Sequence, residues 1–244
     1  MRYVLAALLF SVPAWAQAPP PAPPPAPNES QQLNQAISEA GNSPVDFIRA
    51  LEQHLATYPN STRRNEIERA LVKAAIEAKD DKRIVEYGER VLAREPNDAQ
   101  ILDKIVRALL ATDARDSSER ALTFAKHYEE LLRQTRSQPA PGHVSDAQWR
   151  EEVDKGLARV LTSEARATGN LGKIDEAIAL ARQSYEIYPT AEAAREICRW
   201  LLRAGKDQDE YRWRWAWHEV CSDGFRAGPG SSRNRNRACR ALSR

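Results

Sequence analysis

The sequence predicts an all-α protein, a right-handed solenoid built from antiparallel helix hairpins. Eight apolar stripes with the helical spacing i, i+3, i+4, i+7 lie between residues 45 and 202, and no alternating apolar and polar run indicates a strand. The Pro-Asn pairs at Pro59 and Pro96 are 37 residues apart, and Leu55 and Leu92 precede them at equal distance. A regular spacing of this size indicates stacked helical repeats.

The unit over residues 170–205 shows the pattern most clearly. Its first helix carries Ile174, Ala177, Ile178, Ala181 and Tyr185 on one face, and its second carries Ala194, Ile197, Cys198, Leu201 and Leu202. Between them, Pro189 ends the first helix and Thr190 can cap the second, while Gly205 suits the left-handed position after the helix. Two short helices cannot bury both stripes alone, so we expect such units to stack.

The earlier stripes predict six more helices, each with its own boundary signal. They cover residues 45–58, 67–75, 84–92, 102–110, 121–132 and 149–161. We expect Ser43 to cap the first of these before Pro44, Asn97 to pair with Gln100 at the fourth, and Ser145 with Gln148 to begin the sixth. Gly88 within an apolar stripe indicates that two helices approach closely there.

Residues 161–189 resemble the tetratricopeptide repeat. Ala177, Ala181, Ser184 and Pro189 keep its spacing, although Ala181 stands where an aromatic residue is usual, and Leu161, Ala165 and Gly172 match the preceding helix and turn. Glu164 and Thr168 depart from the pattern. The resemblance implies paired helices that form a concave surface, and a protein or peptide as the partner.

By the repeat spacing, four side chains are expected to face the concave groove: Lys104, Arg107, Arg166 and Trp200. A groove lined by Lys and Arg would suit an acidic peptide or a chain terminus. The alternative is that these are ordinary solvated residues. The row formed by Arg195, Arg199 and Arg203 is interpreted as a solvated helix face.

The N-terminus predicts export. Residues 1–16 combine Arg2, an apolar run and Ala14-Trp15-Ala16, as in a secretory signal peptide cleaved after Ala16. An uncleaved N-terminal anchor is the alternative, although the apolar run is too short to span a membrane. We therefore expect a periplasmic or secreted protein without stable membrane insertion after cleavage.

Residues 17–28 form a Pro-rich linker that holds seven of the fifteen prolines. This composition favours an extended spacer, and the alternative is a ligand for a Pro-recognising groove. The helical repeat domain is expected over residues 29–210.

Residues 211–244 differ sharply from the helical domain, because they hold eight Arg, no Lys and only two acidic side chains. A basic tail with interleaved aromatics could bind nucleic acid or an anionic surface, but export argues against nucleic acid as a partner. A disordered arm and the frame-shifted end of a gene are the other interpretations, and we favour the last. Cys221 and Cys239 could pair there, and a metal site with His218 matches no zinc spacing.

No motif indicates a catalytic, cofactor or metal site, so we expect a protein that is not an enzyme and needs no cofactor. Residues 29–210 are also similar to the repeat region that precedes a thioredoxin-like domain in some exported bacterial proteins. The C-x-x-C pair of that domain is not in this sequence, so no redox residue is carried over. The first hypothesis is an exported interaction scaffold, and the alternative is the docking segment of a thiol-disulfide oxidoreductase.

Overall fold

The computed structural model describes residues 27–206, and within this range the chain forms α-helices and no strands. The helices are α1 (Pro27–Ala40), α2 (Pro44–Thr57), α3 (Arg64–Ala78), α4 (Asp81–Leu92), α5 (Ala99–Leu109), α6 (Arg115–Arg136), α7 (Asp146–Asn170), α8 (Ile174–Ile187) and α9 (Ala191–Arg203). The predicted signal peptide, nearly all of the predicted linker and the whole of the tail, with Cys221 and Cys239, lie outside the described residues.

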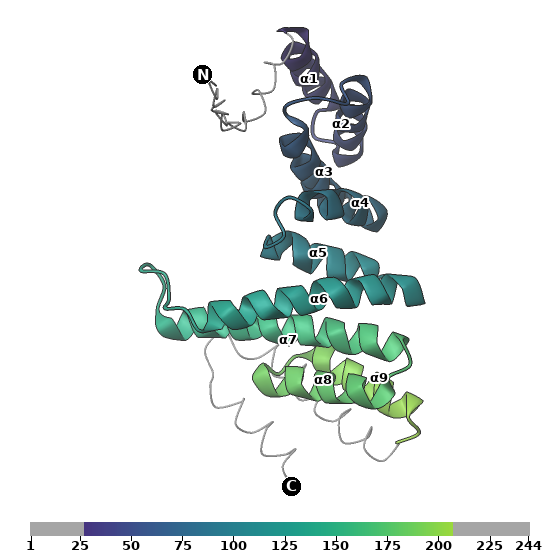
Figure 1. Cartoon of the computed structure of the whole chain (residues 1–244), viewed down its shortest axis with the longest axis vertical. Helices are drawn as coiled ribbons and strands as arrows, with labels where there is room; N and C mark the ends of the chain where they lie inside the picture. The colour runs from purple at the N-terminus through teal and green to yellow at the C-terminus, as the bar shows by residue number, and fades with distance from the viewer. Residues whose placement is uncertain (1–26, 207–244) are drawn as a thin grey trace, which may run out of the picture.

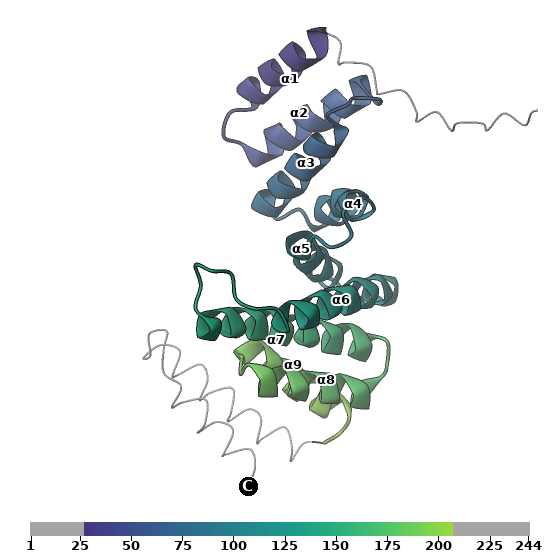
Figure 2. The ribbon, with the colours of Figure 1, turned by 60° about the vertical axis from the view of Figure 1, so that its left-hand side comes forward.

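The helices stack one after another along the long axis of the molecule, each packed against its neighbours in sequence (Figure 1). The helices α6 and α7 are longer than the others, and the loop that joins them projects from the stack (Figure 2). In addition, α7 contacts α9 and α5. The predicted all-α solenoid of helix hairpins is therefore confirmed.

Every apolar stripe found in the sequence lies in a helix, and α1 is an addition to the prediction. It begins at Pro27, the last proline of the predicted linker, and packs against α2, while its Leu33 is buried in the first core cluster. This helix carries few large apolar side chains, so the sequence pattern does not indicate it.

The helix caps test the boundary predictions one by one. The side chains of Ser43, Ser145 and Thr190 cap α2, α7 and α9 as expected, and Gly205 takes a φ of 67° after α9. The predicted pairing of Asn97 with Gln100 is wrong. Asp98 is the N-cap of α5, and its carboxylate accepts from the backbone N–H groups of Gln100 and Ile101. Because Asp98 is the residue directly before the helix, its carboxylate can reach the free backbone N–H groups of the first turn.

The core consists of two clusters that meet at α7. One contains buried side chains from α1 to α7, and the other joins α7 to α8 and α9. The close contact predicted at Gly88 is confirmed, because a Cβ there would lie 2.6 Å from Cδ1 of Ile105 on α5. Among residues 27–206, no helix combines the length and the apolar character that crossing a membrane requires.

Candidate functional site: an arginine-lined hollow

A surface hollow of about 370 Å³ lies where α5, α7 and α9 come together. We call it the arginine hollow. Its lining residues are Arg107, Leu110 and Ala111 from the end of α5, Arg159, Thr162, Ser163 and Arg166 from α7, and Glu192, Arg195, Glu196 and Arg199 from α9.

Helical periodicity places these side chains on the same surface. On α7, Arg159 and Arg166 are seven residues apart with Thr162 and Ser163 between them, so all four share one face. Arg195 and Arg199 are four residues apart on α9. Beneath them, α9 is held by a buried apolar cluster that includes Ala165, Ile197 and Trp200. The buried faces therefore fix which polar faces meet at the hollow.

Five arginines and two glutamates line the hollow, so its lining is strongly positive. Three of the arginines have acidic partners. An N–H of Arg166 donates to Oδ1 of Asp113 at 3.1 Å, Nε of Arg107 is 3.5 Å from Oδ1 of Asp103, and a guanidinium nitrogen of Arg199 is 3.6 Å from Oε1 of Glu196.

Arg159 and Arg195 differ from these three. Within residues 27–206 neither forms an ion pair with a carboxylate, and Nε of Arg195 donates only to the backbone oxygen of Ala191 at 3.3 Å. Among the described residues, no carboxylate therefore competes with an anionic ligand for these two guanidinium groups on neighbouring helices. Arginine suits this task because its planar fork matches the geometry of carboxylates and phosphates.

Two acids near the hollow have shifted pKa values. Burial raises the pKa of Asp113, but the hydrogen bond from Arg166 and the positive charge of that residue outweigh it, so the pKa lies below its ordinary value. Glu196 is the opposite case. Its side chain is only 9% exposed, and burial raises the pKa of its carboxyl despite the nearby charges of Arg199 and Arg166.

The four residues predicted to face the groove all lie on α5, α7 and α9. The structure brings Arg107 and Arg166 together in the arginine hollow. Lys104 lines a neighbouring hollow that shares Arg159, and its Nζ is 3.8 Å from Oδ2 of Asp103. Trp200 is fully buried, so the expectation that its side chain faces a groove is wrong. Its indole instead packs against Gly169 of α7.

Sequence reasoning missed Arg159 and assigned Arg195 and Arg199 to a solvated face. The spacing of Arg159 and Arg166 could have indicated a shared face. That this face meets the Arg195–Arg199 side of α9 depends on helix packing. Arg203, the third member of that row, lies over the Trp200 ring at 4.9 Å and does not line the hollow.

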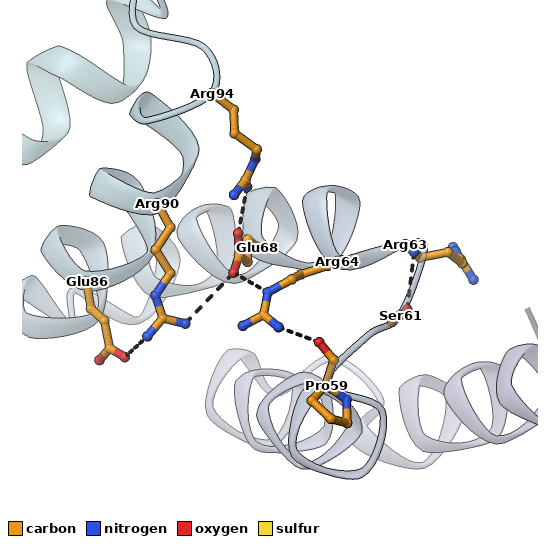
Figure 3. Close-up of polar contacts among 8 residues, drawn as sticks. All are labelled: Pro59, Ser61, Arg63, Arg64, Glu68, Glu86, Arg90 and Arg94. Carbon is orange, nitrogen blue, oxygen red and sulfur yellow. Dashed lines mark hydrogen bonds and ion pairs between the residues drawn. The ribbon is translucent and has the colours of Figure 1, made fainter. Parts of the chain in front are cut away.

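A second group of arginines, on and just after α3 and α4, forms internal ion pairs with one buried carboxylate. The carboxylate of Glu68 is 1% exposed and accepts from Nε of Arg64 at 3.1 Å and from a guanidinium N–H of Arg94 at 2.6 Å (Figure 3). A guanidinium nitrogen of Arg90 lies 3.8 Å from the same carboxylate. These arginines already have a buried internal anion, so the cluster offers less to a ligand than the arginine hollow does.

The described residues hold no group of three or more His, Cys, Asp and Glu side chains placed to bind a metal ion. The chemistry that the arginine hollow can supply is electrostatic attraction and hydrogen-bond donation to an anion.

Comparison with solved structures shows the fold. A MamA structure, described as MamA MSR-1 C2, is 16% identical with a TM-score of 0.53, and the match covers 81% of this chain and 98% of that chain. A kinesin light chain of Podosopora anserina with nearly identical TPR-like repeats is 16% identical with a TM-score of 0.52, covering 82% of this chain and 97% of its own. No family model matches the chain, and no curated protein matches it. The chain therefore has the fold of a tetratricopeptide-like helical repeat protein.

Proposed function

We propose that this protein is an interaction scaffold that binds an acidic segment of a partner protein or peptide in the arginine hollow. The observation that carries the proposal is the pair Arg159 and Arg195, two guanidinium groups without a carboxylate partner among residues 27–206 that line one hollow. Hollowed surfaces of stacked helical repeats suit extended partner segments. A segment rich in Asp and Glu would supply the carboxylates that these arginines lack.

The test is binding of a rhodamine-labelled peptide of six aspartates to the full chain, followed by fluorescence anisotropy at low salt. We expect Arg159→Gln and Arg195→Gln each to weaken binding about tenfold, since a hydrogen bond to a charged group contributes about 1.5–3 kcal/mol. A peptide of six lysines should not bind, and added salt should weaken the aspartate complex.

Arg150→Gln is the matched control, because Arg150 is exposed near the start of the same helix and does not line the hollow. It removes the same charge and should leave the affinity nearly unchanged. Equal losses in Arg150→Gln and Arg159→Gln would show general attraction to a basic surface, which contradicts the proposal, as would the absence of any binding.

Export and association with a thiol-redox partner are also proposals, and the sequence alone supports them. The composition of residues 1–16 supports export. N-terminal sequencing of the protein recovered from the envelope fraction of a bacterial expression host would test it. We expect a mature chain that begins at Gln17, and a chain that still begins at Met1 would contradict this.

A further inference from the structure

Glu196 is an unusual neighbour for an anion site. It is a buried acid on the lining of a hollow that is otherwise dominated by arginines. Its Oε1 is 3.6 Å from a guanidinium nitrogen of Arg199, and hydrogen bonding from the buried Trp200 acts to lower the pKa of the same carboxyl. A carboxylate of a bound partner would pair with the same arginines, in competition with Glu196.

We propose that Glu196 competes with the partner's acidic groups for the arginines of the hollow, so that binding of an acidic segment is accompanied by uptake of one proton at Glu196. The inference rests on the proposed function, because it concerns the regulation of the same site. The carboxylate of Glu196 takes the proton from solvent and becomes a neutral acid. Its hold on Arg199 then weakens, and the guanidinium can turn to the ligand.

The charges around Glu196 support this coupling. The positive groups are Arg199 on its own helix and Arg166 on α7, and the negative charge of Asp113, before α6, also acts on it. Arg107, Arg159, Arg195 and Glu192 complete the charged lining, while α8, which also packs against α9, contributes no residue to the hollow. When Glu196 is protonated, the hollow is lined by one ionised carboxylate, that of Glu192, instead of two.

Burial contributes in the same direction. It raises the pKa of Glu196 above its ordinary value, so protonation requires less of an added charge than it would for an exposed acid. A bound anion raises that pKa further, and by linkage a lower pH strengthens binding of the anion. The raised pKa by itself would be compatible with a structural role, and the position on the hollow's lining is what connects it to the ligand.

The experiment compares the full chain with Glu196→Gln and Glu192→Gln, using the labelled hexa-aspartate peptide at pH 5.5 and pH 8.0. The aspartates stay ionised over this range, because their ordinary pKa is about 3.9. We expect the unmodified protein to bind roughly fivefold more tightly at pH 5.5, a coupling typical of linked sites. Glu196→Gln should bind equally at both pH values, with about the affinity that the unmodified protein has at pH 5.5.

Glu192→Gln is the matched control, since Glu192 is an exposed acid on the same lining. Its replacement removes the same charge and should tighten binding at both pH values while it keeps the pH dependence. Calorimetry in two buffers with different heats of ionisation then measures the protons taken up. We expect uptake in the unmodified protein and in Glu192→Gln, and none in Glu196→Gln.

The two proposals fail in different ways. If the peptide binds at the hollow but Glu196→Gln keeps the full pH dependence and proton uptake, the role of Glu196 is disproved and the proposed function stands. If the peptide does not bind the unmodified protein at either pH, the proposed function itself is disproved. Loss of the folded state in Glu196→Gln would be detected by circular dichroism, and Glu196→Asp, which keeps the titrating group, would then be expected to retain the pH dependence.

Discussion

At the scale of single residues, Gly169 and Trp200 decide how α7 and α9 pack. Trp200 is fully buried, and its six-membered ring lies directly against Gly169. A Cβ at position 169 would overlap this ring, which the surrounding core holds in place. The small residue therefore permits the close approach of α7 and α9, on which the arginine hollow depends.

We expect Gly169→Ala to lower the free energy of unfolding by about 1–2 kcal/mol. Overpacking costs about 1–3 kcal/mol, and the higher helix propensity of Ala offsets part of it. Urea denaturation measures the change. Gly142→Ala is the control, because a Cβ there meets no atom within 4 Å. In Trp200→Phe, which has a smaller ring, the effect of Gly169→Ala should shrink, and equal effects in both backgrounds would refute the contact.

Glu164 is a second residue whose burial affects a measurable property, the pH dependence of the free energy of unfolding. It replaces the residue type expected in the repeat pattern and is 2% exposed, with Glu129 of α6 nearby. Burial, and then the negative charge of Glu129, raise the pKa of Glu164 from 4.5 to about 8. Between these two values the folded protein holds a proton that the unfolded chain has released. The free energy of unfolding therefore falls as the pH rises from 4.5 to 8.

Glu164→Gln should remove this part of the pH dependence. We expect the variant to gain stability relative to the unmodified protein by about 1 kcal/mol per pH unit between pH 5 and pH 8. Denaturation curves at pH 5, 6.5 and 8 give the comparison. Glu152→Gln, at an acid that is 68% exposed on the same helix, should show no such trend. Parallel pH profiles for Glu164→Gln and the unmodified protein would show that Glu164 is ionised throughout.

At the scale of helices, ionic contacts reinforce apolar packing. Glu68 joins α3 to the end of α4, because Arg94 lies just beyond the C-cap residue Ala93 and Arg90 lies in the last turn. Around this carboxylate, Arg64 also donates to the backbone oxygen of Pro59 at 2.6 Å, which ties the start of α3 to the beginning of the loop that follows α2 (Figure 3). One buried acid thus connects three segments of the chain.

Glu68→Gln is expected to destabilise the protein by about 3 kcal/mol, because breaking a buried ion pair leaves its partners without a counter-charge. Thermal or urea denaturation measures the loss. Glu66→Gln is the control, since the side chain of Glu66 is 71% exposed and its ion pair among residues 27–206 is with the neighbouring Arg63. We expect it to change stability by less than about 0.5 kcal/mol. Similar small effects for both variants would mean that the Glu68 cluster contributes little.

At the scale of the whole molecule, stability is distributed along the stack. Most helices contact only their neighbours in sequence, so a local loss of packing is transmitted stepwise. The contacts beyond sequence neighbours centre on α7, which packs against α5, α6, α8 and α9. We therefore expect α7 to stabilise the C-terminal half of the stack.

Leu161→Ala tests this expectation. Leu161 is fully buried on α7, and its truncation should cost about 2–5 kcal/mol. Native-state hydrogen exchange should show lost protection in α6 to α9 and little change in α1 and α2. Val45→Ala, at a side chain that is 57% exposed, serves as the control and should leave exchange unaltered. Uniform loss of protection from α1 to α9 would instead indicate a single cooperative unit.

How far the sequence predicts the structure depends on the range of each interaction. Caps such as Ser43 and Ser145 were predictable, because the side chain and the backbone group it binds are three residues apart. Asp98 was misjudged in favour of Asn97 within the same short turn, where neighbouring polar residues compete. Trp200 was misplaced because repeat spacing alone does not tell which large side chain lies beneath the surface.

The sequence by itself determined the all-α class, the order of the helices and most of their ends, because apolar periodicity, proline and capping residues act within one or two turns of the chain. Only the tertiary structure decided that Arg159 and Arg166 of α7 face Arg195 and Arg199 of α9, and that Glu196 is buried beside them. The α7 and α9 residues of this set are between 29 and 40 positions apart in sequence. Their meeting depends on how closely two helices pack, and at Gly169 that distance is set by a partner, Trp200, which no local pattern identifies.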